Sequence, residues 1–308
     1  MSVFRTLVVV LLLTLILAGA VASGALAQGD GGKIAVTGRI TYVNDDGRSQ
    51  PASGVHVTIL DWDYLPIQGP SEVLTEVFTD EDGVFSATNI DNQDYDNSPR
   101  RPDRTGQDVF IQVRTESPEV TLFDTATLKP FVWSSKGRTG GFFRDAPDGR
   151  RITINLQIQV SDSQLAGMDV YQTMRAGWDF LSEKPELDEP ILAQWGASSL
   201  DGPYYVPGDR IYYDASAAIF PHTILHHFAH ALAWELQGAA GYPIGCFPAQ
   251  TDHSFDLLTR STAECAWTEG WAVGFSMIAL GDPKYRTADG VIDMEVPDAD
   301  TPGWDDGD

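Results

Sequence analysis

The sequence has few basic residues and no cluster of them. Lys and Arg together make up 20 of its 308 residues, against 44 Asp and Glu, so the net charge is −24. Nucleic acid is therefore not an expected partner, because binding to phosphates requires grouped Lys and Arg side chains. The sequence also lacks a Gly-rich phosphate loop and a Gly-x-Ser-x-Gly turn. These absences leave nucleotide chemistry and serine-hydrolase chemistry without support.

Long apolar runs are absent beyond the first 27 residues. Residues 7–21 are almost wholly apolar, follow a short basic start at Arg5, and precede the small residues Ala25-Leu26-Ala27. This pattern predicts a signal peptide over residues 1–27, and the run is short for a membrane-spanning helix. We therefore expect a secreted protein with no membrane span after cleavage. An uncleaved N-terminal membrane anchor is the alternative.

Cysteine is scarce, since Cys246 and Cys265 are the two in the chain. In an exported protein such a pair most often forms a disulfide. A bridge over this spacing would stabilise the fold by roughly 3 kcal/mol in the loop-closure model. The alternative makes Cys265 a metal ligand, because it lies one helical turn before Glu269. Oxidising surroundings favour the disulfide.

Residues 33–160 contain short β-rich runs separated by turns, with no helical pattern between them. The pattern predicts an all-β, antiparallel sandwich. The turn Asp80-Glu81-Asp82-Gly83 predicts a hairpin, with Gly where a positive φ is favoured. Asp80 and Asp82 are also conceivable Ca²⁺ ligands, although the turn already explains both residue types. The predicted strands cover residues 34–43, 54–60, 74–79, 84–88, 109–113 and 152–158.

Three short motifs follow one another in this half: Gly38-x-Ile40, the segment from Pro51 to Val57, and Thr79-Asp80-x-x-Gly83-x-Phe85. Their order resembles the carboxypeptidase regulatory-like, or transthyretin-like, β-sandwich. The resemblance implies an accessory module for folding, spacing or surface attachment rather than an active site. Residues 91–108 indicate a long exposed loop, and His56 is expected to be a surface or packed histidine.

Residues 161–308 change to a helical period of apolar residues. A first helix is predicted over Leu165 to Trp178, and residues 210–214 indicate a strand. Pro221 suits the first turn of a second helix, which is predicted to end where Gly238 follows. The predicted buried side of that helix consists of Ile224, Leu225, Phe228, Leu232 and Leu236.

His226 and His230 lie four residues apart, so both imidazoles project from one face of this helix. A carboxylate from another helix, for which Glu269 is the candidate, would complete three protein ligands and leave a fourth position open. That is the arrangement of a catalytic zinc site, and we predict one Zn²⁺ on these three residues. His222 is the alternative ligand. A packed histidine cluster and a purely structural Glu269 are the alternatives without metal.

Two segments resemble zinc peptidases. The segment from Leu225 to Leu232 matches the Leu-His-Glu-Phe-Ala-His-Ala-Leu of zincin metallopeptidases at every position but one. The segment from Trp267 to Ala272 resembles the glutamate-ligand helix of gluzincins, most closely in their aminopeptidase branch. The resemblance covers residues 211–280 and implies an α+β zincin-like domain over 161–308 that hydrolyses peptide bonds of a peptide or protein substrate. Gly270 would let its helix pack closely against the histidine helix.

The glutamate helix has its own start signal. Ser261-Thr262-Ala263-Glu264 reads as a capping box, with Ser261 as N-cap and Glu264 bonding back to it. Glu264 then lies roughly 140° around the helix from Glu269. The two acids are therefore not expected to share one metal.

The one mismatch to the zincin pattern is His227, which stands where the family carries glutamate. In the family that glutamate moves the proton of the attacking water, and such general acid–base work contributes about 10²- to 10⁴-fold in rate. An imidazole can also accept a proton, so His227 is the candidate catalytic residue. Three hypotheses follow: a peptidase of impaired activity, a non-catalytic pseudo-peptidase acting as a secreted or surface binding protein, and a site closed by His227 as fourth ligand.

The chain continues for 39 residues after Glu269. Gluzincins usually continue with a helical portion that supplies transition-state donors, so the resemblance implies a domain that is C-terminally incomplete or donors from elsewhere. The candidate donors are Tyr204, Tyr205, Tyr242 and the segment from Asp252 to Phe255.

Overall fold

The computed structural model describes residues 32–44, 47–62, 71–92, 106–159, 165–197, 202–214, 220–242, 262–287 and 290–294. Several features of the sequence analysis lie outside these residues. They are the predicted signal peptide, most of the predicted loop 91–108, Cys246, Ser261 and the segment from Asp252 to Phe255. The described chain is mostly β-sheet with three helices, and none of these helices has the length and hydropathy to cross a membrane.

The first sheet is built around β1 (Lys33–Val43). This strand pairs antiparallel with β2 (Ser49–Pro51) and β5 (Val84–Asp91). It pairs parallel with β11 (Arg151–Thr153) and β12 (Leu156–Ile158). The expectation of a purely antiparallel sandwich was therefore wrong. The last strands of this half return beside β1 by a long crossover, and local alternation cannot reveal such a pairing.

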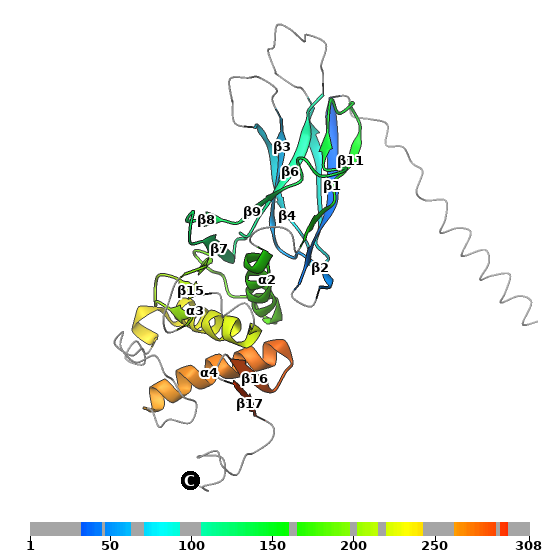
Figure 1. The fold of residues 1–308 in the computed structure, drawn as a ribbon. Helices are drawn as coiled ribbons and strands as arrows, with labels where there is room; N and C mark the ends of the chain where they lie inside the picture. The colour runs from blue at the N-terminus through cyan, green and yellow to red at the C-terminus, as the bar shows by residue number, and fades with distance from the viewer. Residues whose placement is uncertain are drawn as a thin grey trace, which may run out of the picture.

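The second sheet is antiparallel and faces the first (Figure 1). In it β3 (His56–Asp61) lies between β4 (Val73–Phe78) and β6 (Val109–Arg114). Further along, β9 (Val132–Ser134) and β10 (Phe142–Phe143) pair with β6. Because alternate side chains of both sheets point inward, they form one sandwich-like core. Its buried residues include Val36, Ile40, Phe85, Val57, Ile59 and Ile111.

The turn at Asp80 to Gly83 has the predicted chemistry but joins two sheets. The Asp80 carboxylate accepts hydrogen bonds from the amides of Asp82 and Val84 at 3.0 and 2.8 Å, and Gly83 has φ of +72°. However, β4 pairs with β3 while β5 pairs with β1. The predicted hairpin is therefore a connection between the two sheets of the sandwich.

A third sheet combines strands from both sides of residue 160. Its order is β14 (Tyr204–Tyr205), β15 (Ile211–Tyr213), β13 (Ile191–Trp195), β7 (Val120–Asp124) and β8 (Lys129–Pro130). The central strand β13 is parallel to both β15 and β7. β7 and β8 precede the predicted boundary at residue 160, so hydrogen bonds cross that boundary. The division of the chain into two domains stays a prediction.

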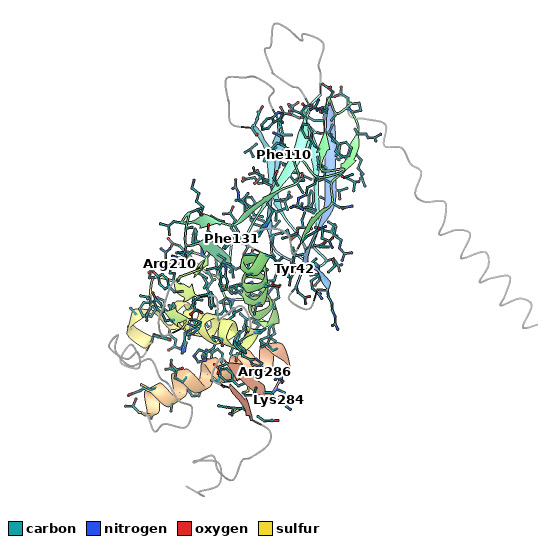
Figure 2. All side chains as sticks on the ribbon, in the orientation of Figure 1. Tyr42, Phe110, Phe131, Arg210, Lys284 and Arg286 are labelled. Carbon is teal, nitrogen blue, oxygen red and sulfur yellow. The ribbon has the colours of Figure 1, made fainter. Side chains whose placement is uncertain are left out.

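The helix α2 (Leu165–Phe180) connects the sandwich to the rest of the fold (Figure 1). The Tyr171 hydroxyl donates to the Gly54 carbonyl at 2.7 Å, on the sandwich side. Phe131, labelled beside α2 in Figure 2, packs on Gly167 so closely that a Cβ there would come within 2.7 Å of its ring. The buried hydrophobic residues consequently form one continuous cluster across both halves.

The remaining elements are α3 (Pro221–Gly241), α4 (Ala263–Leu280) and a hairpin of β16 (Lys284–Thr287) and β17 (Gly290–Asp293). Four of the five residues predicted on the buried side of α3 are buried, but Leu236 is 56% exposed. The expectation that Leu236 is buried was wrong because the buried part of α3 ends near Ala233, before the helical geometry is interrupted at Gly238.

Candidate metal centre

The two histidines of the candidate site project from the regular part of α3. Pro221 occupies its first turn, as predicted, and helical geometry continues until Gly238, which has φ of +64° and ψ of 175°. The apolar side, with Leu225 and Phe228, is fully buried against the core. His226 and His230 lie beside this apolar side of the helix, and their side chains face Glu269 of α4.

The carboxylate comes from the second turn of α4. Thr262, and not the predicted Ser261, is the N-cap, and its hydroxyl accepts a hydrogen bond from the Cys265 amide at 3.3 Å. The helix thus starts one residue later than the capping box predicted. The indole of Trp271 donates to the Ala229 carbonyl of α3 at 3.4 Å, which ties the two helices together. Both helices are rigid supports for the facing side chains.

Gly270 in the glutamate motif does not have the role predicted for it, which was to let α4 pack closely against α3. A Cβ added to Gly270 would meet no atom within 4 Å. The close approach of α3 and α4 therefore does not depend on the absence of a side chain at this position. Sequence resemblance suggested a contact that the packing of this chain does not require.

Three ligand-type atoms converge between the helices. His226 Nε2 and His230 Nε2 lie 3.0 Å apart, and Glu269 Oε2 lies 3.1 and 3.4 Å from them. A tetrahedral zinc with ligand bonds of about 2.1 Å would separate its ligand atoms by roughly 3.4 Å. The donor set and spacing therefore fit Zn²⁺. In the described part of the chain, no other group of His, Cys, Asp and Glu converges in this way.

Burial makes this cluster electrostatically costly unless its members are paired. Side-chain exposure is 13% for His226, 3% for His230 and 14% for Glu269. Burial alone would raise the pKa of the Glu269 carboxyl, but hydrogen bonds and charge from the two histidines overcome it and hold that pKa well below its usual range. Burial lowers the pKa of His230, partly opposed by its hydrogen bond to Glu269. The site thus favours an ionised Glu269 carboxylate, the form of this side chain that binds metal.

The outer nitrogens of the two imidazoles differ in their surroundings. His230 Nδ1 lies 3.0 Å from the hydroxyl of Tyr242, whose side chain is buried. His226 Nδ1 is buried and has no hydrogen-bond partner among the described residues. Burial raises the pKa of the Tyr242 phenol well above its ordinary value, so the hydroxyl stays neutral.

His227 lies next to the cluster but contributes no atom to it. Its ring centroid is 5.1 Å from that of His226 and 6.4 Å from that of Tyr213, which it meets edge to face. Its Nδ1 is buried without a hydrogen-bond partner among the described residues. Burial first, and then the charges of the neighbouring histidines, hold the pKa of His227 well below its usual value. The geometry does not add His227 as a fourth ligand.

His222, the alternative ligand, points elsewhere. Its Nε2 lies 3.4 Å from the Asp282 carbonyl oxygen, and its ring meets Tyr285 edge to face at 5.7 Å. Burial lowers the pKa of His222. Tyr285 also lies near His226, with ring centroids 6.1 Å apart, and sequence reasoning missed it. A four-residue strand gives no periodic signal that would have placed this ring at the site.

The other predicted residues lie as follows. Tyr204 stacks on Tyr212 at 4.7 Å, and the hydroxyl of Tyr205 accepts from the Gly208 amide at 3.3 Å. Cys265 is buried and is not a free thiol. Because Cys246 lies outside the described residues, their pairing stays a prediction.

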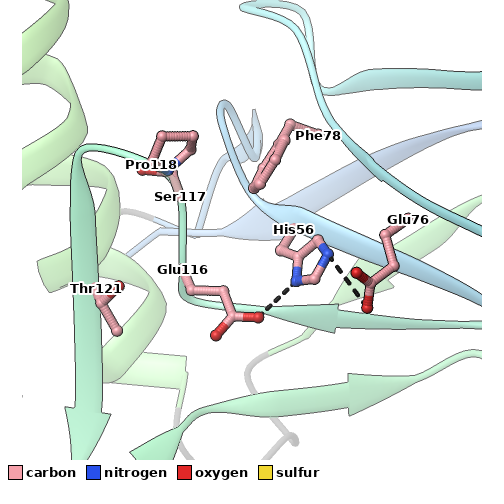
Figure 3. A pocket seen from close by; sticks show the side chains of 7 residues that line it. All are labelled: His56, Glu76, Phe78, Glu116, Ser117, Pro118 and Thr121. Carbon is pink, nitrogen blue, oxygen red and sulfur yellow. Dashed lines mark hydrogen bonds and ion pairs between the residues drawn. The ribbon is translucent and has the colours of Figure 1, made fainter. Parts of the chain in front are cut away.

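A second group of titratable side chains lines a shallow pocket of about 520 Å³ on the sandwich (Figure 3). The sequence left His56 as either a surface or a packed histidine, and it is packed. It is buried in this pocket and stacks on Phe78, with the ring centroids 5.1 Å apart. Its Nδ1 donates to Glu116 Oε1 at 2.5 Å, and its Nε2 lies 3.7 Å from Glu76 Oε1. The hydrogen bond from His56 lowers the pKa of Glu116, against the effect of burial and with help from Arg114. None of the three clustered metal-ligand candidates lines this pocket.

Comparison with known proteins relates the metal-centre half of the chain to a peptidase-associated domain. The family model that matches is the Mycolysin C-terminal domain, over residues 176–308. This match covers less than half of the chain but includes α3, α4 and the three clustered residues. No curated protein matches the chain.

Solved structures match only remotely. A 9R-lipoxygenase from Cyanothece is 15% identical over 48% of this chain and 23% of its own, with a TM-score of 0.23. (S)-allantoin synthase is 11% identical over 42% of each chain, with a TM-score of 0.24. Catechol 1,2-dioxygenase from Pseudomonas arvilla is 10% identical over 45% of this chain and 56% of its own, with a TM-score of 0.22. At such scores the similarities carry no argument about function.

Proposed function

We propose that this protein is an exported zinc-dependent metallopeptidase-like protein that acts on peptide bonds, with zinc held by His226, His230 and Glu269. The observation that carries the proposal is the convergence of two Nε2 atoms and one carboxylate oxygen within 3.0–3.4 Å. The family match to a peptidase-associated domain over the same residues supports it independently.

The chemistry of these three residues suits a catalytic rather than a structural metal. Three protein ligands leave a coordination position open to water or substrate. Zinc at this position would act as a Lewis acid that polarises a carbonyl group and activates water. The role of the chain is to keep Glu269 ionised and to orient all three side chains from packed helices.

The missing glutamate limits the expected rate. His227 occupies the position from which the zincin glutamate moves a proton, and an imidazole can accept one. Its ring meets those of His226 and Tyr213 edge to face, and its Nδ1 is buried with no hydrogen-bond partner among the described residues. We therefore infer impaired peptide hydrolysis, with His227 as a weak general base.

The alternative is a non-catalytic pseudo-peptidase that acts as a secreted or surface binding protein. The same packing of His227 favours it, because a ring packed edge to face on Tyr213 also fits a purely structural role. In both cases we propose two domains: a carboxypeptidase regulatory-like sandwich over residues 33–160 as an accessory module, and a zincin-like domain of the gluzincin type over residues 161–308. We also propose that the protein meets a peptide or protein partner outside the cytoplasm.

Zinc content tests the proposal directly. We expect about one zinc per purified full-length chain, measured by elemental analysis after exhaustive dialysis. The double variant His226→Ala/His230→Ala and the single variant Glu269→Gln should lose it, because each removes a ligand. His222→Ala is the matched control, since it removes a histidine of the same helix that lies outside the cluster, and it should keep the zinc.

Turnover of a peptide library then separates the two candidates. Slow cleavage that disappears in the Glu269→Gln variant supports the peptidase, whereas bound zinc without cleavage supports the pseudo-peptidase. Full retention of zinc in the double alanine variant would show that the metal is held elsewhere and would overturn its assignment to His226, His230 and Glu269.

A further inference from the structure

A change of chain direction at the end of α3 brings the side chain of Tyr242 back toward the candidate metal centre. On an uninterrupted helix, Tyr242 would lie about 18 Å along the axis from His230. The helical path is broken at Gly238, whose φ of +64° and ψ of 175° belong to a region that is essentially restricted to glycine. Beyond the break, the Tyr242 amide donates to the Gly238 carbonyl at 3.1 Å. As a result the Tyr242 hydroxyl reaches 3.0 Å from His230 Nδ1.

We propose that Tyr242 is a positioning residue of the metal centre, whose hydroxyl fixes the tautomer and the ring orientation of His230. The proposal rests on the proposed zinc site. A neutral imidazole carries one N–H, so only one of its nitrogens has a lone pair for a metal. When Nδ1–H donates to the Tyr242 oxygen, the lone pair is on Nε2, the atom that faces His226 and Glu269.

The packing of the tyrosine makes this contact a fixed one. Tyr242 is 4% exposed and meets the indole of Trp234 edge to face at 5.7 Å. Its ring therefore has little freedom to move away from His230. The hydroxyl lies on the edge of His230 opposite the ligand atom Nε2, which is the place for orienting a ligand. This position does not suit the transition-state donor that the sequence suggested as a role for Tyr242.

The contact supports only one of the two histidine ligands. His226 Nδ1 is buried without a partner among the described residues, so nothing in that part of the chain fixes its tautomer in the same way. Partners of this kind typically change metal affinity or activity by about 10- to 100-fold. We therefore expect much of the orientation of the site to depend on the Tyr242 hydroxyl.

The experiment compares zinc affinity in Tyr242→Phe and wild-type full-length protein by competition with a chromogenic zinc chelator. The substitution removes one oxygen and keeps the ring against Trp234. We expect a zinc dissociation constant at least about tenfold higher in the variant, with the stoichiometry unchanged and with a loss of metal-free stability that is smaller than the loss in zinc-binding free energy. Tyr204→Phe is the control, because that tyrosine stacks on Tyr212 instead, and its zinc affinity should equal wild type.

A second variant keeps the hydroxyl but moves it. Gly238→Ala strains the backbone break, although a Cβ there would meet no atom within 4 Å. We expect it also to weaken zinc binding, and Tyr242→Phe added to it should cause little further loss, because both changes break the same contact. Cobalt-substituted protein gives an independent readout, since the visible absorption of Co²⁺ should differ between Tyr242→Phe and wild type.

The outcomes separate the two proposals. If wild type binds no zinc, the proposed function fails and this positioning role fails with it. If wild type binds zinc and Tyr242→Phe binds it equally well, only the positioning role is overturned. A loss of affinity that is matched by an equal loss of metal-free stability would make Tyr242 a packing residue and would also overturn it.

Discussion

At the scale of single residues, position 227 decides how the proposed site would work. Zinc ligands alone cannot move the proton of the attacking water, and the neighbouring group that zincins use for this purpose is a carboxylate. Here an imidazole stands at that position, packed against Tyr213. Whether the site lacks only this group can be tested by restoring it.

We expect His227→Glu to raise peptide hydrolysis by about 10²-fold or more, which is the usual contribution of a positioned general base. A glutamate is ionised well below pH 7 and can accept the proton. Initial rates on a peptide library, with zinc content measured on the same samples, check this expectation.

His227→Gln is the matched control for that experiment. It has the same length as glutamate and should retain zinc, but an amide cannot accept the proton, so no gain is expected. Equal and negligible turnover in wild type and both variants despite bound zinc would contradict the missing-base hypothesis. The non-catalytic binding function would then be favoured.

Glu116 gives a pH-dependent prediction that is independent of the metal. Its pKa is lowered below the ordinary value of 4.5, chiefly by the hydrogen bond from His56. A lowered pKa in the folded state contributes stability that is present above the ordinary value and is lost as the pH falls through the folded-state pKa. We expect the difference in unfolding free energy between wild type and Glu116→Gln to shrink as the pH falls below about 4.5.

Urea unfolding at a series of pH values measures this difference. Glu76→Gln is a suitable control, because Glu76 is half exposed and lies 3.7 Å from His56 rather than 2.5 Å. Its effect should be smaller at every pH, since exposed pairs contribute little. A difference for Glu116→Gln that stays the same down to about pH 3 would show that the ion pair is not its cause.

At the scale of elements, the contact of α2 with α3 depends on a glycine. A Cβ at Gly177 would lie 2.6 Å from Leu225 Cδ2 and 3.2 Å from Phe228 Cδ1. Leu225 precedes the first histidine of the cluster directly. The packing of these two helices therefore affects both stability and the position of the ligands.

We expect Gly177→Ala to lower the unfolding free energy by about 1–3 kcal/mol, the usual effect of overpacking a filled core. Zinc affinity should fall as well, because the shift reaches α3 beside His226. Gly274→Ala on α4 is the control. A Cβ there meets nothing within 4 Å, so the better helix propensity of alanine should leave stability unchanged or raise it by up to about 1 kcal/mol. Equal effects of the two substitutions in chemical denaturation would refute the proposed close contact.

Local signals in the sequence predicted the elements of the site well. The i, i+4 spacing of His226 and His230, Pro221 at the helix start and Gly238 at its end are all properties of short segments, and the structure confirms them. Glu269 was predicted from a motif and lies in the cluster. Tyr242 was predicted as a candidate donor and not as a contact of His230, and Tyr285 was not predicted at the site, because both positions depend on a chain reversal and a hairpin rather than on periodicity.

At the scale of the whole molecule, a buried arginine links the two halves of the fold. Arg175 of α2 donates to Ser117 Oγ at 3.2 Å and to Glu119 Oε2 at 2.5 Å, in the turn between β6 and β7. Its side chain is 9% exposed, and it also pairs with Asp179 at 3.2 Å. Removing Arg175 would take a charged donor from buried Ser117 and from the Glu119 carboxylate, which is 30% exposed, while Asp179 would keep its pair with Lys184.

Arg175→Gln should therefore lower the unfolding free energy by about 2 kcal/mol, the usual contribution of hydrogen bonds to a charged group. Lys184→Gln, which breaks the exposed pair with Asp179, should cost at most about 1 kcal/mol. Because the core is continuous, we expect one unfolding transition in both variants and in wild type when far-ultraviolet circular dichroism and tryptophan fluorescence are compared. Two separated transitions in wild type would show instead that the halves unfold independently.

Pairings between distant strands were the part of the fold that the sequence could not predict. Alternation identified β1, β3 and β6 as strands, but it does not specify a partner. The parallel pairing of β1 with β11 and β12, and the position of β7 beside β13, are set by long crossovers and by the core as a whole. Composition therefore indicated a sandwich followed by helices and missed the sheet that both halves share.

The shared sheet has a practical consequence for dissecting this protein. A fragment that starts at residue 161 would contain β13 but lose β7, its hydrogen-bonded neighbour from Val120 to Asp124. The bare edge of β13 would then offer unpaired amides and carbonyls to any other extended chain, which favours aggregation. Fragments for expression are better begun before Val120, and an insoluble metal-centre fragment would reflect a missing strand rather than a damaged site.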